Sequence, residues 1–301
     1  MSGYVEGILV LLAINIVFAY GAFLPIAAGQ LNLGVAGFAA IGGYASAWLS
    51  NTLAMSVLIA IPLGALAAGT VALAVAVPVL RTRGIYLALA TFALGEIVRA
   101  SILNLEAIGG AAGYPVADFV GFPTIAAFAV GVTLFAWLLF ATRFGIAITA
   151  VHDDERVADL MGINVLAFQV CAFVLGSALA GIGGGLYAHH FNYIEAQYFN
   201  ISLSISIVLY VLFGGTQSVI GPLIGAAVFT LLPELLRGSA QWRYVLFAAI
   251  VIMVMAVRPQ GVVTGVQMRR LLGFTRDPLP PSDHGGLAGE GRGEKGEEQA
   301  A

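Results

Sequence analysis

Long apolar runs dominate the chain from its first residues to about position 257, with short polar stretches between them. About nine such runs can be drawn, and most reach the roughly 20 residues that a helix needs to cross a membrane. Their approximate bounds are 6–28, 33–50, 53–79, 85–103, 122–141, 167–189, 201–216, 218–236 and 242–257. The pattern predicts an all-α, polytopic transmembrane helix bundle of about 8–10 spans.

Small and polar residues break this pattern in two places. The first break, around 29–34, contains Asn32 and Gly34. The second carries Gly214, Gly215, Gly221 and Pro222. Irregular backbone at membrane depth faces protein or a water-filled cavity, and transporters place paired broken helices in two repeats around a central pathway. We therefore expect broken helices and, as a hypothesis, internal repeats. The second break suits either tight helix packing or a flexible gate.

One island of charge, His-Asp-Asp-Glu-Arg at 152–156, lies inside this apolar chain. Burying it in lipid would cost on the order of ten kcal/mol, so it must lie in water on a loop between spans. A helix is expected over about 151–162, with Asp154, Ala158 and Met161 on one face. Chemistry alone leaves two interpretations open: a helix that docks into a groove on a soluble partner, or a solvated connecting helix.

The positions of the arginines predict how the chain is oriented across the membrane. They follow the third run (Arg81, Arg83), flank the charged island (Arg143, Arg156) and follow the last run (Arg258, Arg269, Arg270, Arg276). The loops near 104–121 and 190–200 contain no Lys or Arg. Because cytoplasmic loops are enriched in Lys and Arg, nine spans with an external N-terminus place all three arginine groups in the cytoplasm.

Composition narrows the function further. The chain is 60% hydrophobic and 10% charged, against about 25% charged in soluble domains. Lys295 is the only lysine and follows Glu294, so the chain has no Walker-type nucleotide site and no intramembrane Schiff-base lysine. We therefore predict a protein that is not an enzyme, with no cofactor and no metal site. The net charge of −3 gives no reason to expect a nucleic-acid partner.

Charged and polar side chains inside the spans are candidates for function. Glu96 and Arg99 are three residues apart on the fourth run and can pair on one helix face. They are either pathway residues or a self-neutralised structural pair. Asn15 is expected to bond across helices, and Asn32 either does the same or lines a pathway. His189 and His190 are expected to be exposed at an outer helix end.

Residues 150–164 resemble the coupling loop of ABC importer membrane subunits, and specifically the LivM-like permeases for branched-chain amino acids. Further matching pieces are 80–91, 95–97, Asn104 with Gly109, Gly110 and Gly113, Ala172-Phe173 with Ala180, Gly181 and Gly184, 214–226, and 258–261. The resemblance covers roughly 25–262. His152 stands where the family often has Arg, and Ile108 where it often has Thr.

The resemblance implies a permease domain over 1–262, with a coupling loop at about 142–166. The stretch 277–301 is rich in Pro, Gly and Glu and has no apolar period, so we expect a disordered cytoplasmic tail there. The resemblance also implies a multi-pass protein of the bacterial inner membrane, partnered by two cytoplasmic ATPases that bind the ATP, a second homologous permease, a periplasmic or extracellular solute-binding protein, and membrane lipid. The expected ATPase-coupling residues are His152, Asp153, Asp154, Glu155, Ala158 and Gly162. The expected pathway or gate residues are Asn32, Gly34, Glu96, Arg99, Asn104, Gly214, Gly215, Gly221 and Pro222.

Two other functions remain open at this stage. The same importer class also carries urea and short amides, and no residue here separates these cargoes from apolar amino acids. An ion-coupled secondary transporter would instead need ionisable residues along several spans, and only Glu96 and Arg99 meet that requirement.

Overall fold

The structure is a computed structural model that describes residues 3–236, 245, 248–249, 251–253, 256 and 262. The chain divides into two compact units, Met1–Gly265 and Val266–Ala301, and only the first contains described residues. Most of the predicted run at 242–257, the motif at 258–261 and the predicted disordered tail at 277–301 therefore lie outside the described residues.

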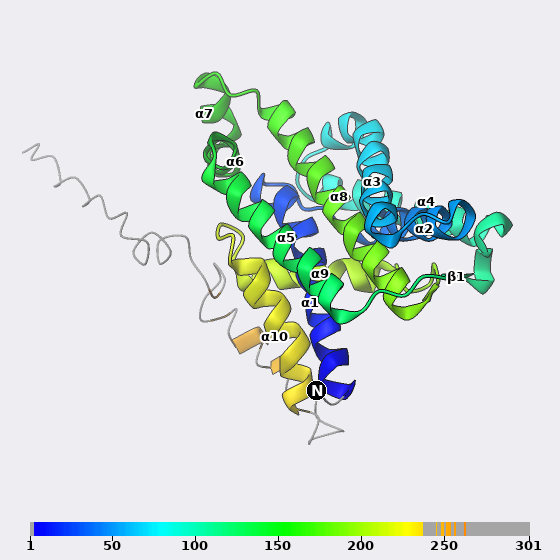
Figure 1. The fold of residues 1–301 in the computed structure, drawn as a ribbon. Helices are drawn as coiled ribbons and strands as arrows, with labels where there is room; N and C mark the ends of the chain where they lie inside the picture. The colour runs from blue at the N-terminus through cyan, green and yellow to red at the C-terminus, as the bar shows by residue number, and fades with distance from the viewer. Residues whose placement is uncertain are drawn as a thin grey trace, which may run out of the picture. The chain divides into compact units, whose positions relative to one another are not determined.

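Helices make up most of the described chain, as the apolar runs predict (Figure 1). They are α1 (Gly3–Ala27), α2 (Val35–Leu53), α3 (Val57–Leu80), α4 (Ile85–Leu103), α5 (Phe122–Ala141), α6 (Arg143–Asp153), α7 (Glu155–Leu160), α8 (Val165–Phe191), α9 (Ile201–Gly214) and α10 (Gly221–Leu235). The short elements are the 3₁₀ turns η1 (Glu106–Ile108) and η2 (Gly110–Ala112) and the strands β1 (Tyr114–Pro115) and β2 (Tyr193–Ile194). Within the described part of the chain, five helices are long and apolar enough to cross a membrane: α1, α3, α4, α5 and α8. The prediction of an all-α transmembrane bundle is confirmed.

Helix α8 lies at the centre of the bundle and packs against α1, α2 and α3. Glycines allow the backbones to approach closely along these contacts. A Cβ added at Gly42 of α2 would lie 2.3 Å from the Cα of Gly181 on α8, and one at Gly184 would lie 1.9 Å from the carbonyl oxygen of Ala39. Lipid provides no hydrophobic force between helices, so such close van der Waals packing is what holds the bundle together.

Side chains that bond across helices reinforce the packing. The amide nitrogen of Asn15 on α1 donates to the hydroxyl of Thr230 on α10 at 2.9 Å, which confirms the expected role of Asn15. The hydroxyl of Tyr20 donates to the carbonyl oxygen of Val219, between α9 and α10, at 2.9 Å. These bonds give polar groups of the spans a partner within the protein, as a membrane environment requires.

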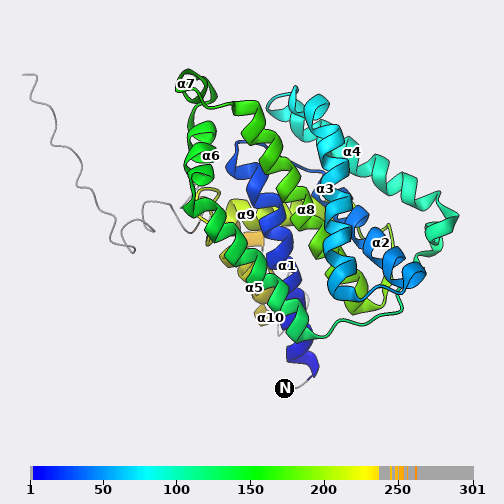
Figure 2. The ribbon, with the colours of Figure 1, turned by 45° about the horizontal axis from the view of Figure 1, so that its top comes forward.

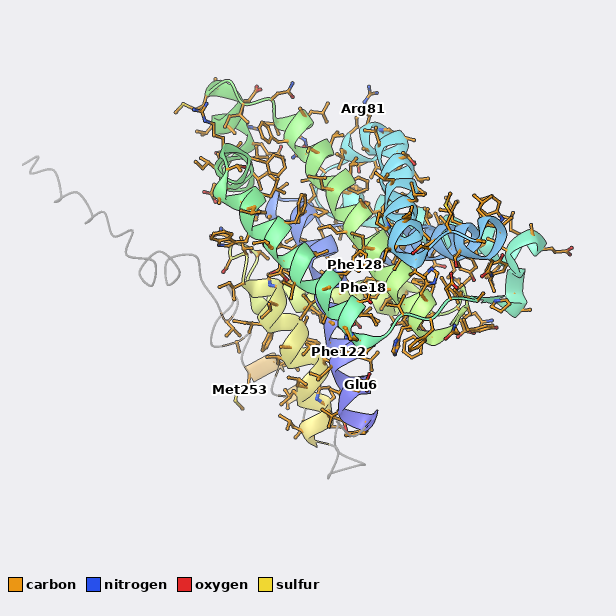
Figure 3. The ribbon with its side chains drawn as sticks, in the orientation of Figure 1. Glu6, Phe18, Arg81, Phe122, Phe128 and Met253 are labelled. Atoms are coloured by element: carbon orange, nitrogen blue, oxygen red, sulfur yellow. The ribbon has the colours of Figure 1, made fainter. Side chains whose placement is uncertain are left out.

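Figure 2 shows α6 and α7 at one end of the bundle and the N-terminus at the other. The turn after α3 and the helices α6 and α7 lie at one end, where Arg83 pairs with Glu155 at 3.6 Å. Figure 3 shows Arg81 at this end and Glu6 near the opposite end. Two of the three arginine groups thus lie together, in agreement with the predicted orientation. The third group lies outside the described residues.

At the opposite end, two connecting loops are held together by hydrogen bonds. Strands β1 and β2 pair antiparallel, with Tyr114 opposite Ile194. The ring of His189 lies 3.1 Å from the carbonyl oxygen of Asp118 and is 0% exposed. The expected surface exposure of His189 is therefore wrong, because the loop at 113–121 folds back over the end of α8 and covers it. His190, which is half-buried, bonds in the same way to Val120.

We predict that Gly184→Ala destabilises the protein by about 1–3 kcal/mol, because the new methyl group meets the backbone of α2 and the helices must separate. The measurement is thermal unfolding in detergent micelles. Gly131→Ala is the matched control, since Gly131 lies on the exposed face of α5 and nothing lies within 4 Å of its added Cβ. A Gly184→Ala protein as stable as the control would contradict the close approach of α2 and α8.

Candidate functional site

The charged island folds into two short helices rather than the single helix expected over 151–162. Asp154 separates them, with an extended backbone (φ −157°). Its carboxylate accepts hydrogen bonds from the backbone N–H groups of Arg156 at 2.8 Å and Val157 at 3.1 Å. The single-helix prediction is wrong because an aspartate is among the preferred N-cap residues, and here it begins α7 instead of continuing α6. Gly162, with φ of +81°, follows the end of α7, as its position in the sequence suggests.

The exposed face of α7 also differs from the prediction. Ala158 is 2% exposed and faces the protein, whereas Met161 is 78% and Leu160 87% exposed. Asp154, Ala158 and Met161 therefore do not form one outward face. The apolar tip formed by Leu160 and Met161, with the half-exposed Val157 beside it, was missed from the sequence. Two adjacent apolar residues in a loop that must be solvated were the available signal.

Glu155 makes contacts inside the protein. One of its carboxylate oxygens accepts a hydrogen bond from the Gln169 side chain of α8 at 2.8 Å, and the other lies 3.6 Å from Arg83. Glu155 thus ties α7 both to α8 and to the turn between α3 and α4. Asp153, the last residue of α6, stays exposed, and neighbouring His152 lies beside Gly29, which belongs to the break between α1 and α2.

That break is a segment of non-helical backbone that is bonded to α4 and α9, and its residues Gln30, Asn32 and Gly34 are buried. The N–H of Leu33 donates to the hydroxyl of Thr91 on α4 at 3.0 Å, and the N–H of Ala36 donates to the hydroxyl of Ser204 on α9 at 3.0 Å. Asn32 is 1% exposed and accepts a bond from the N–H of Gly34. The predicted first break is confirmed, and side chains of neighbouring helices satisfy the N–H groups at the start of α2.

Next to the break, α2, α4 and α9 enclose a small, partly open cavity. Its polar lining comes from Glu96, Asn200 and Ser204, and its apolar lining includes Phe92 and Phe199. The backbones approach closely at the cavity wall, since a Cβ at Gly37 would lie 2.7 Å from the Cα of Gly95 and one at Gly34 would lie 2.6 Å from the carbonyl oxygen of Thr91.

Glu96 and Arg99 form the pair that their spacing predicts. The Nη2 and Nε atoms of Arg99 donate to Oε2 of Glu96 at 2.6 and 2.9 Å, and both side chains are about one-third exposed, at 31% and 30%. Asn104 is not brought to the cavity, because its side chain bonds to the carbonyl oxygen of Ala100 at the end of α4.

The second predicted break is a tight turn between α9 and α10. A Cβ at Gly214 would lie 1.9 Å from the carbonyl oxygen of Gly221, so the two helix ends touch through their backbones. Gly215 has φ of +122°, which favours glycine, and Pro222 lies in the first turn of α10. Tight packing is therefore present at this break, whereas its role as a gate and the internal repeat remain predictions.

The sequence also matches a known protein family over most of its length. Residues 4–257 match the family described as "Branched-chain amino acid transport system / permease component". The chain belongs to this family. Together with the five helices of the described residues that are long and apolar enough to span, this makes it a multi-pass protein of the bacterial inner membrane.

Among individual relatives, the chain is 27% identical over 269 residues to the high-affinity branched-chain amino acid permease LivM of Salmonella typhimurium, covering 77% of this chain and 63% of that protein. It is 29% identical to the fructose import permease FrcC of Rhizobium meliloti over 42% of this chain and 37% of that protein. It is 41% identical to the nucleoside permease NupC of Lactococcus lactis over 20% and 19% of the two chains. No solved structure matches significantly.

The contacts of Glu155 predict a measurable change in α7. Glu155→Ala removes the bonds to Gln169 and Arg83, which at this exposure contribute about 1 kcal/mol, so amide hydrogen exchange in 155–160 should become roughly fivefold faster. The control is Asp159→Ala, which removes a carboxylate that is exposed on the same helix. Equal exchange rates in the two variants would show that Glu155 does not hold α7.

Proposed function

We propose that the chain is a permease subunit of a binding-protein-dependent ABC importer and that its cargo is a branched-chain or other apolar amino acid. The observation that carries the proposal is the apolar tip of α7, presented at the arginine-bearing end of a bundle whose family is that of branched-chain amino acid permeases. No G-x-x-x-x-G-K-[ST] sequence occurs in the chain, so the energy for uphill transport has to come from other subunits.

The apolar tip supports a pair of cytoplasmic ATPases as partners. Leu160 and Met161 are mostly exposed although they lie in water, which leaves apolar area for a partner to cover. Apolar side chains that insert into a pocket supply much of the binding energy of an interface. In this arrangement Glu155 and Asp154 make contacts within the protein. Glu155 bonds α7 to α8, and Asp154 caps the N-terminus of α7. ATP binding in the partners then moves α7, and with it α8 and the turn after α3.

The exposed face of α4 supports a second permease subunit and a shared pathway. Helices α4 and α5 are equally uncovered, with 22% of their spanning windows buried. The uncovered side of α5 is apolar, and Phe128, Val132 and Phe135 line an apolar groove between it and α8, which suits lipid. Helix α4 instead carries Glu96 and Arg99, which are costly next to acyl chains. We assign the α5 face to lipid and the α4 face to the second permease.

The cargo assignment follows the LivM relatives, and the solute-binding protein is expected to supply most of the selectivity. The relatives that carry nucleoside and fructose align over smaller parts of the chain. Urea and short amides remain cargoes of the same importer class. The family match favours an importer over an ion-coupled transporter.

The apolar tip gives a test of the ATPase contact. Leu160→Ser with Met161→Ser should weaken ATPase association by about 2 kcal/mol or more, roughly 30-fold in affinity, because the partner's pocket loses its apolar anchors. Binding of purified ATPase subunits to the permease pair in nanodiscs measures this. Leu105→Ser, at an exposed apolar residue of the opposite end, is the control. Unchanged affinity in the double variant would remove the main support for this contact.

The function itself is tested by reconstitution. Proteoliposomes with this chain, the neighbouring permease, the ATPases and the binding protein should accumulate labelled leucine against a gradient only when ATP is supplied to the cytoplasmic side. Uptake by this chain alone, driven by an ion gradient, would contradict the proposal.

A further inference from the structure

The last turn of α6 lies against the buried break between α1 and α2. Ile148 and Val151 of α6 are buried against the bundle. His152 follows Ile148 by four residues, so its side chain leaves the helix on nearly the same face. A Cβ added at Gly29 would lie 3.9 Å from the Cα of His152 and 4.0 Å from Nδ1 of its ring. The ring therefore lies against the break, although the sequence led us to expect His152 among the residues that contact the ATPases.

The residue after Gly29 is a glutamine whose side chain has no partner. Gln30 is 2% exposed, and neither Oε1 nor Nε2 of its amide makes a hydrogen bond within the described part of the chain. Its backbone N–H donates to the carbonyl oxygen of Pro25 at 2.9 Å, so the backbone is held while the side chain is not. Buried amides are nearly always hydrogen-bonded, and one that is not raises the free energy of the arrangement that buries it.

His152 has a matching unpaired atom. Nδ1 of its ring is buried and has no hydrogen-bond partner among the described residues. A neutral imidazole nitrogen is a donor in one tautomer and an acceptor in the other, and the amide of Gln30 offers one group of each kind, so the two side chains can bond in either tautomer. Unpaired groups on the two segments that meet at Gly29 indicate an arrangement in which a bond between those segments is open.

We propose that His152 and Gln30 form a latch, unpaired in the arrangement that the structure shows and hydrogen-bonded to each other in the arrangement that the ATP-loaded partners favour. The latch rests on the proposed function, because contacts of the partners with α7 are what shift the equilibrium. Asp154 begins α7 only two residues after His152, so a movement of α7 reaches the ring directly. The closed latch ties the break to α6, and the bonds of Leu33 and Ala36 pass the movement on to α4 and α9.

An ordinary packing contact would not need a glutamine at this position. Leucine has a similar size and no polar atom to satisfy, so it would fill the same buried space at a lower free energy. The glutamine raises the free energy of the open arrangement and lowers that of an arrangement in which its amide is bonded. The pair thereby brings the two arrangements closer in free energy, and a transporter that alternates between them needs both to be populated. His152 and Gln30 are positioning residues in this scheme and do not touch the cargo.

The first test replaces the amide by an apolar group of similar size. In proteoliposomes with the complete importer and labelled leucine as the probe, Gln30→Leu should lower leucine uptake per ATP hydrolysed at least about fivefold, because the closed arrangement loses the equivalent of one hydrogen bond. ATPase affinity should stay the same, and the melting temperature without nucleotide should stay the same or rise. A purely structural glutamine predicts unchanged uptake per ATP. Gln197→Leu, at an exposed glutamine of the opposite end, is the matched control and should leave all three quantities unchanged.

A double-mutant cycle tests whether the two side chains act as a pair. His152→Leu should lower uptake per ATP as much as Gln30→Leu does. The double variant should be no worse than either single variant, since each substitution removes the same bond. Losses that multiply in the double variant would show that the two residues act independently and would overturn the latch.

A second measurement reports the distance between the two residues. Cys171 is the only cysteine of the chain, so Cys171→Ser with Gln30→Cys and His152→Cys leaves a single pair of thiols. Copper phenanthroline should crosslink this pair faster when the ATPases hold a non-hydrolysable ATP analogue than when they hold no nucleotide. Equal rates in the two conditions, or unchanged uptake per ATP in Gln30→Leu, would overturn the latch alone. Failure of the wild-type vesicles to take up leucine with ATP would overturn the proposed function, and the latch with it.

Discussion

The close approach of helix backbones at glycine is the constraint on which the rest of the structure depends. In lipid, apolar side chains gain nothing by leaving the solvent for a neighbouring helix, so the helices associate through contact area and hydrogen bonds. Gly42, Gly181 and Gly184 bring α2 and α8 into backbone contact, and Gly37 and Gly95 do the same for α2 and α4. The position of the break at 29–34, and of the cavity beside it, follows from these two contacts.

The break shows how a non-helical segment is accommodated inside such a bundle. Backbone N–H groups that leave the helical pattern need acceptors, and Thr91, Ser204 and Asn32 supply them. These acceptors come from three different parts of the chain. The start of α2 is therefore fixed relative to α4 and α9 by specific hydrogen bonds, and a shift of any one helix changes the lining of the cavity.

Much of this fold was predictable from the sequence, and the reason is the length of the apolar runs. Eight of the predicted runs correspond to α1–α5 and α8–α10, because membrane thickness sets a length that shows directly in composition. The pairing of Glu96 with Arg99 was also predictable, because the two residues are three positions apart on one helix. The predictions that were wrong concerned tertiary contacts or the conformation of a single residue. The burial of His189 depends on a loop some seventy residues earlier in the chain, and the split at Asp154 reflects one cap competing with helix continuation. The exposure of Leu160 and Met161 depends on which face of the short helix α7 packs against the bundle, and that is a tertiary property too.

The paired loops at the far end of the bundle have a mechanical consequence. There, Asn51 bonds to both Pro115 and Ala117, Asn192 bonds to Val116, and two histidine rings hold the backbone of 118–120. Among the described residues at the arginine-bearing end, Glu155 forms an exposed ion pair with Arg83 and accepts a hydrogen bond from the Gln169 side chain. The described side-chain bonds between segments are thus more numerous at the end that carries β1 and β2 than at the end that carries α7. In the proposed importer, a partner that moves α7 would act at the end where fewer side-chain bonds join the described segments.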